Sequence, residues 1–266
     1  MTGNKKNSSS FSHKLSVQRR VVWALILRET ITRYGRENIG ILWFFVEPLL
    51  FTIGITILWS FSEGKRISTG SVAELAIVSY PTILLWRNST GRVSKAIEVN
   101  KPLLHNRPIR HMDFFYSRII LEFASVSASF LLIFLSFIVL GISHAPADLL
   151  AMVMGWVLIA WFSFGFVIIM GALSELSDSI ERTSHIILYF MLPFSGILPT
   201  YLVPEPFRSY LLLFPLVNCV EYFRYGYYGE SMATYFNLKY TIMANLFFTL
   251  FALTLMNKAI RKTEIV

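Results

Sequence analysis

Long apolar runs separated by short polar stretches dominate the chain from about residue 39 onward. A helix needs about 20 mostly apolar residues to cross the hydrocarbon core of a bilayer. Six runs are candidates for such helices, and they cover residues 39–61, 72–89, 123–142, 149–173, 184–203 and 241–256, of which the last is short but acceptable. The second is weakened by Glu74, Pro81 and Arg87. The fifth is broken at Pro193 and Pro199. The pattern predicts an all-α membrane protein with six transmembrane helices between residues 39 and 260.

The segment before the first run has a different pattern. Residues 1–14 are polar and are predicted to form a disordered tail, and residues 15–38 are predicted to form an amphipathic helix on the cytoplasmic leaflet. At helical spacing, one seam holds Trp23, Leu27, Ile31 and Tyr34, and the roughly opposite side holds Glu29, Arg33 and Arg36. The candidate functional residues of this helix are Arg28, Glu29, Arg33 and Tyr34. The alternative is an ordinary basic flank that only sets topology.

Residues 204–230 lie between the last two runs and are rich in Pro and aromatic residues. Their most apolar part, residues 210–217, is too short to cross a bilayer. Short re-entrant or interfacial helices before the last span are therefore predicted. Tyr222 and Tyr225 belong to the aromatic cluster of this segment, which is typical of an interfacial belt and could also stack on sugars.

Composition agrees with a membrane protein, because hydrophobic residues make up 55% of the chain and charged residues only 15%. Of the 24 Lys and Arg residues, 18 fall on one side of the predicted membrane when both termini share that side. The positive-inside rule places this side in the cytoplasm, together with the tail at residues 261–266. The net charge of +8 is largely explained in this way, so no nucleic-acid partner is predicted.

Charges inside the predicted spans are the first candidates for function. Glu47 stands in the first span before Pro48, and Arg87 stands near the cytoplasmic end of the second span beside Trp86. A charge within a span is costly and usually faces a partner or a wet cavity. Arg87 is therefore predicted at the mouth of a substrate pathway, with a snorkelling arginine as the alternative.

The loop at residues 99–115 mixes cations, prolines and apolar residues. Its candidate contact residues are Asn106, Arg107, Pro108, Arg110 and Asp113. This mixture favours docking onto another protein, although a loop that only sets topology is the alternative.

Motifs for catalysis are absent from the sequence. It has no G-x-x-x-x-G-K-[ST], H-E-x-x-H, G-x-S-x-G or D-x-D, and its five His residues lack ligand spacing. The single cysteine, Cys219, excludes an internal disulfide and a cysteine metal site. We predict no enzyme activity and no cofactor in this chain, so active transport would draw energy from another subunit or an ion gradient.

Residues 24–50, 80–122 and 209–230 are three stretches that together resemble the ABC-2-type permeases that export capsular polysaccharide from Gram-negative bacteria. "ALILRETITRYGRENIGILWFFVEPLL" (residues 24–50) is the most specific, because it joins L-R-E, T-R-Y-G, L-W and E-P at fixed spacing. Residues 80–122, which include Tyr80, Pro81 and "WRN", and residues 209–230 are similar to later parts of that family.

The resemblance implies six spans, an interface helix and re-entrant helices before the sixth span. It also implies a homodimer in the bacterial inner membrane with two cytoplasmic ATPase subunits, which bind ATP and Mg. A periplasmic co-polymerase and an outer-membrane exporter are expected as further partners. The loop at residues 99–115 would be the coupling helix, and the shorter loop at residues 174–183, which includes Glu181, would make a second, smaller contact.

The substrate implied by the resemblance is a lipid-linked, often anionic polysaccharide. Trp59, Tyr80 and Trp86 could then offer faces to sugar rings, with Arg87 as a fixed cation. The rival interpretations are an O-antigen, teichoic-acid or drug permease, an ion-coupled carrier and a membrane-bound glycosyltransferase.

Overall fold

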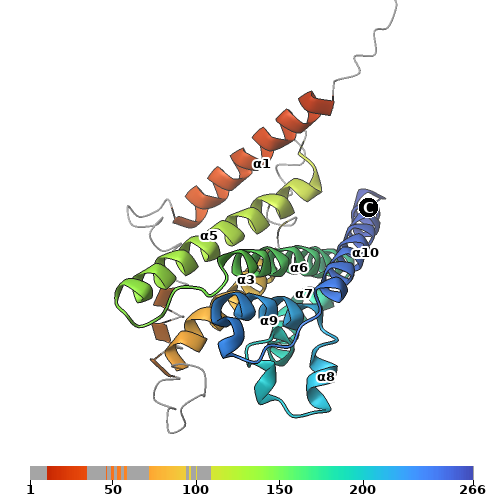
Figure 1. Ribbon diagram of the computed structural model, residues 1–266. Coiled ribbons are helices and arrows are strands. Elements are labelled where there is room, and N and C mark those ends of the chain that lie inside the picture. The colour runs from red at the N-terminus through yellow and green to blue at the C-terminus, as the bar shows by residue number, and fades with distance from the viewer. Residues whose placement is uncertain are drawn as a thin grey trace, which may run out of the picture.

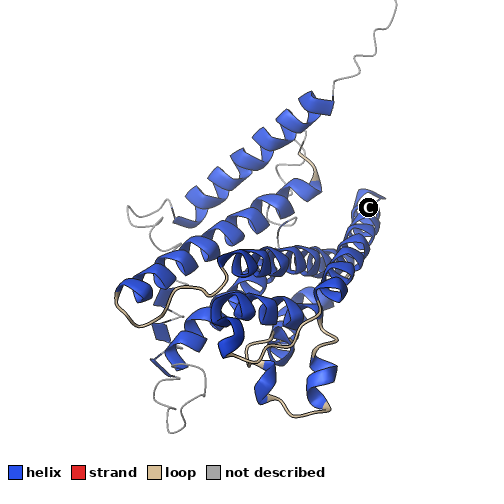
Figure 2. Ribbon diagram, viewed as in Figure 1, coloured by secondary structure: helices blue, strands red, loops and turns tan. Residues whose placement is uncertain are grey.

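A computed structural model describes residues 11–34, 46, 49–50, 53–54, 57–58, 72–93, 96, 100 and 109–265. Within these residues every regular element is helical, as Figures 1 and 2 show. The longer helices are α1 (Phe11–Tyr34), α3 (Val72–Val93), α5 (His111–Val139), α6 (Leu149–Leu176), α7 (Asp178–Phe190), α9 (Pro215–Tyr228) and α10 (Leu238–Ile265). The short ones are η1 (Leu192–Ser195), η2 (Thr200–Leu202), α8 (Phe207–Leu211) and η3 (Gly229–Ser231).

Three helices of the described part are long and apolar enough to cross a membrane. They are His111–Val139, Leu149–Leu176 and Leu238–Lys262. They correspond to the third, fourth and sixth predicted spans. Most of the first predicted span lies outside the described residues. The six-span count therefore remains a prediction, whereas the all-helical fold is confirmed for the described residues.

The fifth predicted span is the most irregular. Helix α7 ends at Phe190, and the chain continues through η1, which has a proline in its first turn, and a turn at Gly196 to η2. A proline lacks a backbone N–H and clashes with the preceding turn, so it commonly kinks or ends an α-helix. The break at Pro193 and Pro199 that the sequence predicts is therefore present. Helices α8 and α9 are short, as predicted for residues 204–230.

Three boundaries differ from the predictions. Helix α5 begins at His111, so the last residues of the predicted loop at 99–115 are its first turn. Helix α1 begins at Phe11, inside the predicted tail, and α10 continues through the predicted tail at 261–266 to Ile265. Hydropathy could not locate these ends, because it detects apolar runs and each extension is polar in sequence.

The main core is built from α3, α5, α6 and α9. Trp86 of α3 meets Phe166 of α6 edge to face, with ring centroids 5.7 Å apart. Helices α6 and α9 approach at two glycines. A Cβ added at Gly226 would lie 2.2 Å from the backbone nitrogen of Met152, and one added at Gly155 would lie 2.6 Å from the Cα of Phe223. Only glycine permits so close an approach of two backbones.

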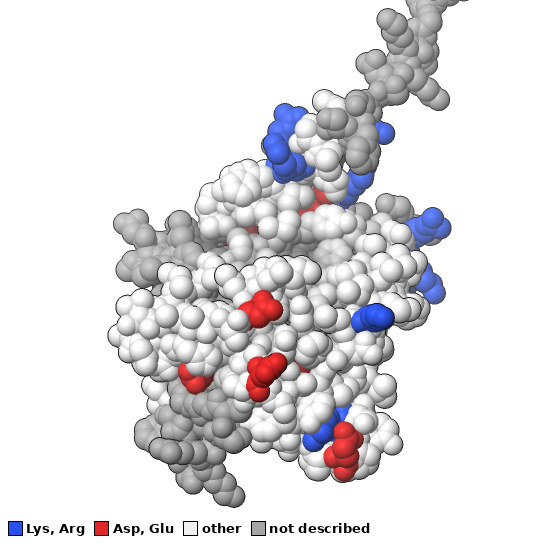
Figure 3. All heavy atoms as spheres, viewed as in Figure 1, with Lys and Arg blue, Asp and Glu red and all other residues white. Residues whose placement is uncertain are grey.

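Charge is distributed unevenly over the surface. In Figure 3, Lys and Arg side chains gather over α1 and near the C-terminal end of α10, and a broad surface between the charged groups is uncharged. This arrangement is the one that the positive-inside rule leads us to expect of a chain whose α1 and C-terminus share one side.

Candidate functional site

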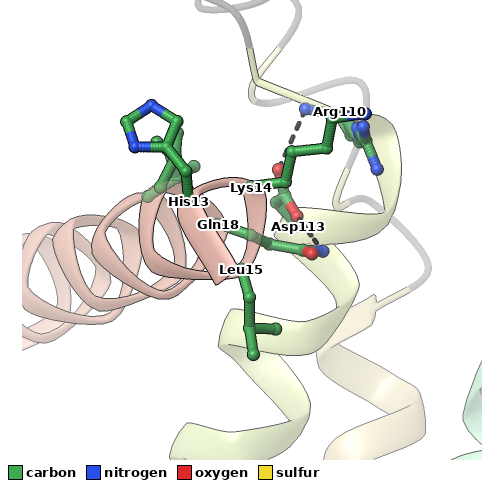
Figure 4. A pocket seen from close by; sticks show the side chains of 8 residues that line it. His13, Lys14, Leu15, Gln18, Arg110 and Asp113 are labelled. Atoms are coloured by element: carbon green, nitrogen blue, oxygen red, sulfur yellow. Dashed lines mark hydrogen bonds between the residues drawn. The ribbon is translucent and has the colours of Figure 1, made fainter. Parts of the chain in front are cut away.

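Helix α1 is held against the start of α5 by a buried carboxylate. Gln18 donates a hydrogen bond from Nε2 to Oδ1 of Asp113 at 3.2 Å, and the backbone N–H of Arg110 donates to Oδ2 at 3.0 Å (Figure 4). Asp113 is only 2% exposed. One side chain therefore both satisfies a backbone donor at the beginning of α5 and fixes α1 beside it.

A cavity of about 440 Å³ opens beside this contact (Figure 4). Its lining residues are His13, Lys14, Leu15, Val17, Gln18, Val21, Arg110 and Asp113. The apolar members come from α1, and Lys14 and Arg110 are exposed. Because the Asp113 carboxylate is occupied by two hydrogen bonds, the cavity combines apolar contact surface with accessible positive charge.

Three helices meet in a network of charged side chains. Arg118 of α5 lies with Nε 3.5 Å from Oε1 of Glu29 in α1, and it also donates to the backbone carbonyl of Arg92 in α3. Arg92 Nε in turn lies 2.9 Å from Oε1 of Glu122 in α5. Arg28 of α1 donates to Asn100 Oδ1 at 2.7 Å. Glu29 therefore faces α5, whereas Trp23, Leu27 and Ile31 of the apolar seam are exposed.

The predicted contact residues have different outcomes. Arg110 and Asp113 lie together at the cavity, and Arg28 and Glu29 are joined to the neighbouring network. Arg33 and Tyr34 lie in the last turn of α1, and Glu181 lies in the first turn of α7. Asn106, Arg107 and Pro108 lie outside the described residues.

The predicted pathway residues on α3 separate into two groups. Tyr80 and Trp86 are buried in the core, with Trp86 only 1% exposed. This corrects the prediction that they offer faces to sugar rings, because large apolar side chains at these positions instead pack α3 against its neighbours. Glu47 and Trp59 lie outside the described residues.

Arg87 lies at the surface of this core and contacts α7. The centre of its guanidinium group stands 5.0 Å from the ring centroid of Tyr189, which is 60% exposed. This is a cation–π contact. Tyr222 and Tyr225 of α9 form a separate cluster, in which both rings lie near Phe236, at 5.1 and 5.5 Å between centroids.

The sequence analysis missed a buried ion pair on α9. Arg224 donates from Nη1 to Oε1 of Glu221 at 2.8 Å, and neither side chain is exposed. Arg224 also donates to Ser79 Oγ of α3 and to the carbonyls of Gly196 and Ile197. An acidic and a basic residue three positions apart in an apolar segment was the available signal. The count of basic residues on the two sides of the predicted membrane instead places Arg224 in the segment before the last span, on the side opposite the cytoplasm.

Metal chemistry finds no support in the described part of the chain. There, no group of three His, Cys, Asp or Glu side chains is placed to hold a metal ion. The described residues offer a basic, partly apolar cavity at α1 and α5, ion pairs that join α1, α3 and α5, and a partly exposed cation, Arg87, on α3.

Comparison with known proteins connects these features to a family. The ABC-2 type transporter family model matches residues 20–228. The capsule polysaccharide export inner-membrane protein CtrC of Neisseria meningitidis serogroup B is 36% identical over 259 residues, which cover 97% of this chain and 98% of the relative.

Two further relatives have similar names. The capsule polysaccharide export inner-membrane protein BexB of Haemophilus influenzae is 34% identical over 94% of each chain. The polysialic acid transport protein KpsM of Escherichia coli is 27% identical over 85% of this chain and 90% of its own length. The apolar helices, the family match and the near full-length similarity agree, and the chain belongs to the ABC-2 type transporter family.

Proposed function

We propose that this chain is the transmembrane subunit of an ATP-driven exporter that moves lipid-linked capsular polysaccharide across the bacterial inner membrane. The observation that carries the proposal is the 36% identity to a capsule polysaccharide export inner-membrane protein over 97% of the chain. Three apolar helices and an ABC-2 type transporter match support a multi-pass membrane protein. Both termini are proposed to be cytoplasmic, on the basis of the charge asymmetry.

The energy source in this proposal is a separate ATPase chain that binds ATP and Mg. Two copies of the permease assemble with two copies of the ATPase, and each permease presents the loop at residues 99–115. The cavity beside Arg110 and Asp113 supports this role, because it offers positive charge and apolar surface next to that loop. A periplasmic co-polymerase and an outer-membrane exporter complete the proposed assembly.

Force from the ATPase would reach the spans through the charged network. Glu29, Arg118 and Arg92 connect α1, α5 and α3 at one end of the bundle. A displacement of the α1–α5 contact would therefore move the end of α3, and with it Arg87. These contacts resist separation to the extent that they are buried, because breaking one of them leaves a charge unpaired.

Capsule assays in a strain lacking this chain test the proposal. We expect the mutant to accumulate capsular polymer inside the cell, to display none at its surface and to keep its O-antigen unchanged. The wild-type chain should restore surface capsule and co-purify with the ATPase. Loss of O-antigen with normal capsule would instead assign the chain to a different lipid-linked cargo.

A charge reversal separates docking from topology. Arg110→Glu should weaken co-purification with the ATPase and reduce surface capsule, because Arg110 lines the proposed docking cavity. Lys258→Glu, an exposed position on α10, is the matched control and should leave both unchanged. Normal co-purification and export of the Arg110→Glu chain would favour a loop that only sets topology.

A further inference from the structure

An open groove lies between α5 and α6, the two helices that the turn at residues 140–148 connects (Figure 1). Its volume is about 350 Å³, and its lining side chains come from residues 123–134 of α5 and 149–157 of α6, with Phe223 of α9. Phe130, Met152 and Phe223 are buried, whereas Leu131 and Val153 are 54% and 50% exposed. The groove therefore has a floor in the core and a rim at the surface of the bundle.

The lining of the α5–α6 groove is almost entirely apolar. Its one hydroxyl belongs to Ser127, and the indole N–H of Trp156 donates to this oxygen at 2.9 Å. No charged side chain belongs to the lining. A sugar or a charged headgroup placed here would lose its hydrogen bonds to water and gain few in return. The groove is therefore complementary to hydrocarbon.

The position of the groove along the helices matches one leaflet of a bilayer. Both α5 and α6 are long and apolar enough to cross a membrane, so the exposed rim faces lipid. Residues 123–134 extend about 17 Å along α5 at about 1.5 Å per residue. The hydrocarbon core of a bilayer is about 30 Å thick, so one leaflet contributes about half of that. The groove thus follows the leaflet on the side of the turn at residues 140–148.

The size of the groove separates a lipid chain from a helix. An apolar cavity of about 150 Å³ accepts benzene, so by proportion a cavity of this size has room for about a dozen carbon atoms. One turn of an α-helix is a cylinder about 10 Å wide and about 5.4 Å long, which amounts to roughly 420 Å³. A single helical turn would exceed the whole groove. A partner helix therefore does not fit inside it, whereas an extended acyl chain does.

We infer that the α5–α6 groove binds one acyl chain of a membrane phospholipid, whose headgroup lies at the level of the turn at residues 140–148. A chain in the groove contacts protein on its floor and on both walls, whereas a chain on a convex helix surface contacts protein on one side only. More atoms at contact distance mean more dispersion energy, so this chain is retained in preference to others. The inference goes beyond the proposed function, because the occupant belongs to the surrounding bilayer and is independent of the cargo.

Photolabelling of the full-length chain tests the site. The probe is a phosphatidylcholine with a diazirine at the end of one acyl chain, added to the chain in mild detergent and followed by washing, irradiation and peptide mapping. We expect the label at the deep end of the groove, near Phe123 and Val157. The exposed apolar face of α10 around Phe247 is the internal comparison and should carry little label.

Variants that fill the groove make the test specific. Val153→Trp occupies the groove and should reduce labelling about tenfold or more, because each methylene kept out of an apolar site lowers affinity about fourfold. Leu150→Trp is the matched control, since Leu150 is 73% exposed and does not line the groove. It should label like the wild type. Val157→Phe shortens the groove at its deep end and serves as a second filling variant if Val153→Trp does not fold.

The opposing outcomes are distinct. Equal labelling of α10 and of the groove, or undiminished labelling of the filling variants, overturns the site. A disulfide that forms between two copies of a Val153→Cys chain, together with absence of label, shows that a second copy covers the groove and also overturns it. Each of these results leaves the proposed function intact, because capsule export by the wild type is measured separately.

Discussion

Arg224 Nη1 lies 2.8 Å from Glu221 Oε1, and both side chains are completely buried on α9. Glu221 also accepts the backbone N–H groups of Thr200 and Tyr235, at 3.1 and 3.3 Å. Arg224 reaches Ser79 of α3. One ion pair therefore connects α9 with α3, with the turn before η2 and with the segment that precedes α10.

Removing one member of this pair should be strongly destabilising. Arg224→Ala leaves the Glu221 carboxylate buried without its cation, and we expect a loss of about 3–5 kcal/mol in the free energy of unfolding, measured by denaturation in detergent. The control is Glu205→Ala, because Glu205 is an exposed partner of Arg208. Glu205→Ala should lower the free energy of unfolding by about 1 kcal/mol or less. Equal losses would contradict the assignment of Arg224 as a buried hub.

A second prediction concerns the close approach of α6 and α9 at Gly226. Gly226→Ala places a methyl group against the backbone of Met152, so the helices must separate, and we expect a cost of about 1–3 kcal/mol or more. Gly91→Ala is the matched control, since a Cβ at Gly91 meets nothing within 4 Å. It should be neutral or slightly stabilising, because alanine is the better helix former. Thermal unfolding of the two variants compares them directly.

Docking of α1 provides a third prediction. Asp113→Ala removes the acceptor for both Gln18 and the Arg110 backbone, and we expect α1 to separate more readily from α5. Limited trypsin digestion should then cut faster at Arg19 and Arg20 in α1. Asp113→Asn keeps one acceptor oxygen and should show an intermediate rate. A digestion rate like that of the wild type in Asp113→Ala would show that apolar packing alone holds α1.

Membrane orientation provides a fourth prediction. Cysteines introduced at His105 and Ser179 should react with an impermeant thiol reagent only from the cytoplasm, and one at Ser68 only from outside, because 18 of 24 basic residues share one side. Cys219 is fully buried, so the natural chain is a suitable background. External labelling at His105 would reverse the proposed orientation.

Hydropathy predicted α5, α6 and α10, because a long apolar run has few stable alternatives to a spanning helix. It could not reveal the true start of α5, where Asp113 and Arg118 are polar in sequence but are paired with α1 in the structure. A charged residue in an apolar stretch of sequence indicates an energetic cost of burial, but the sequence does not identify the residue that pairs with it. Ion pairs and hydrogen bonds between helices that are distant in sequence are therefore visible only in the structure.

The candidate site was predicted only in part for the same reason. Arg87 was identified because a cation within an apolar run is unusual, but nothing in the sequence indicated that Tyr189 lies beside it. Trp86 was assigned to the surface of a pathway, whereas it packs on Phe166. Aromatic residues occur both in the core of a membrane protein and along a substrate pathway. Their burial in the structure distinguishes the two locations, whereas the sequence does not.

The two glycines between α6 and α9 also limit how sequence changes at this interface can be tolerated. Gly226 faces the backbone of Met152, and Gly155 faces the backbone of Phe223, so neither glycine contacts a side chain that could be shortened to make room. A defect caused by a larger residue at either position cannot be relieved by trimming the opposite residue. A selection for restored export from a Gly226→Ala chain should therefore return glycine at position 226 itself, and not second-site suppressors on α6.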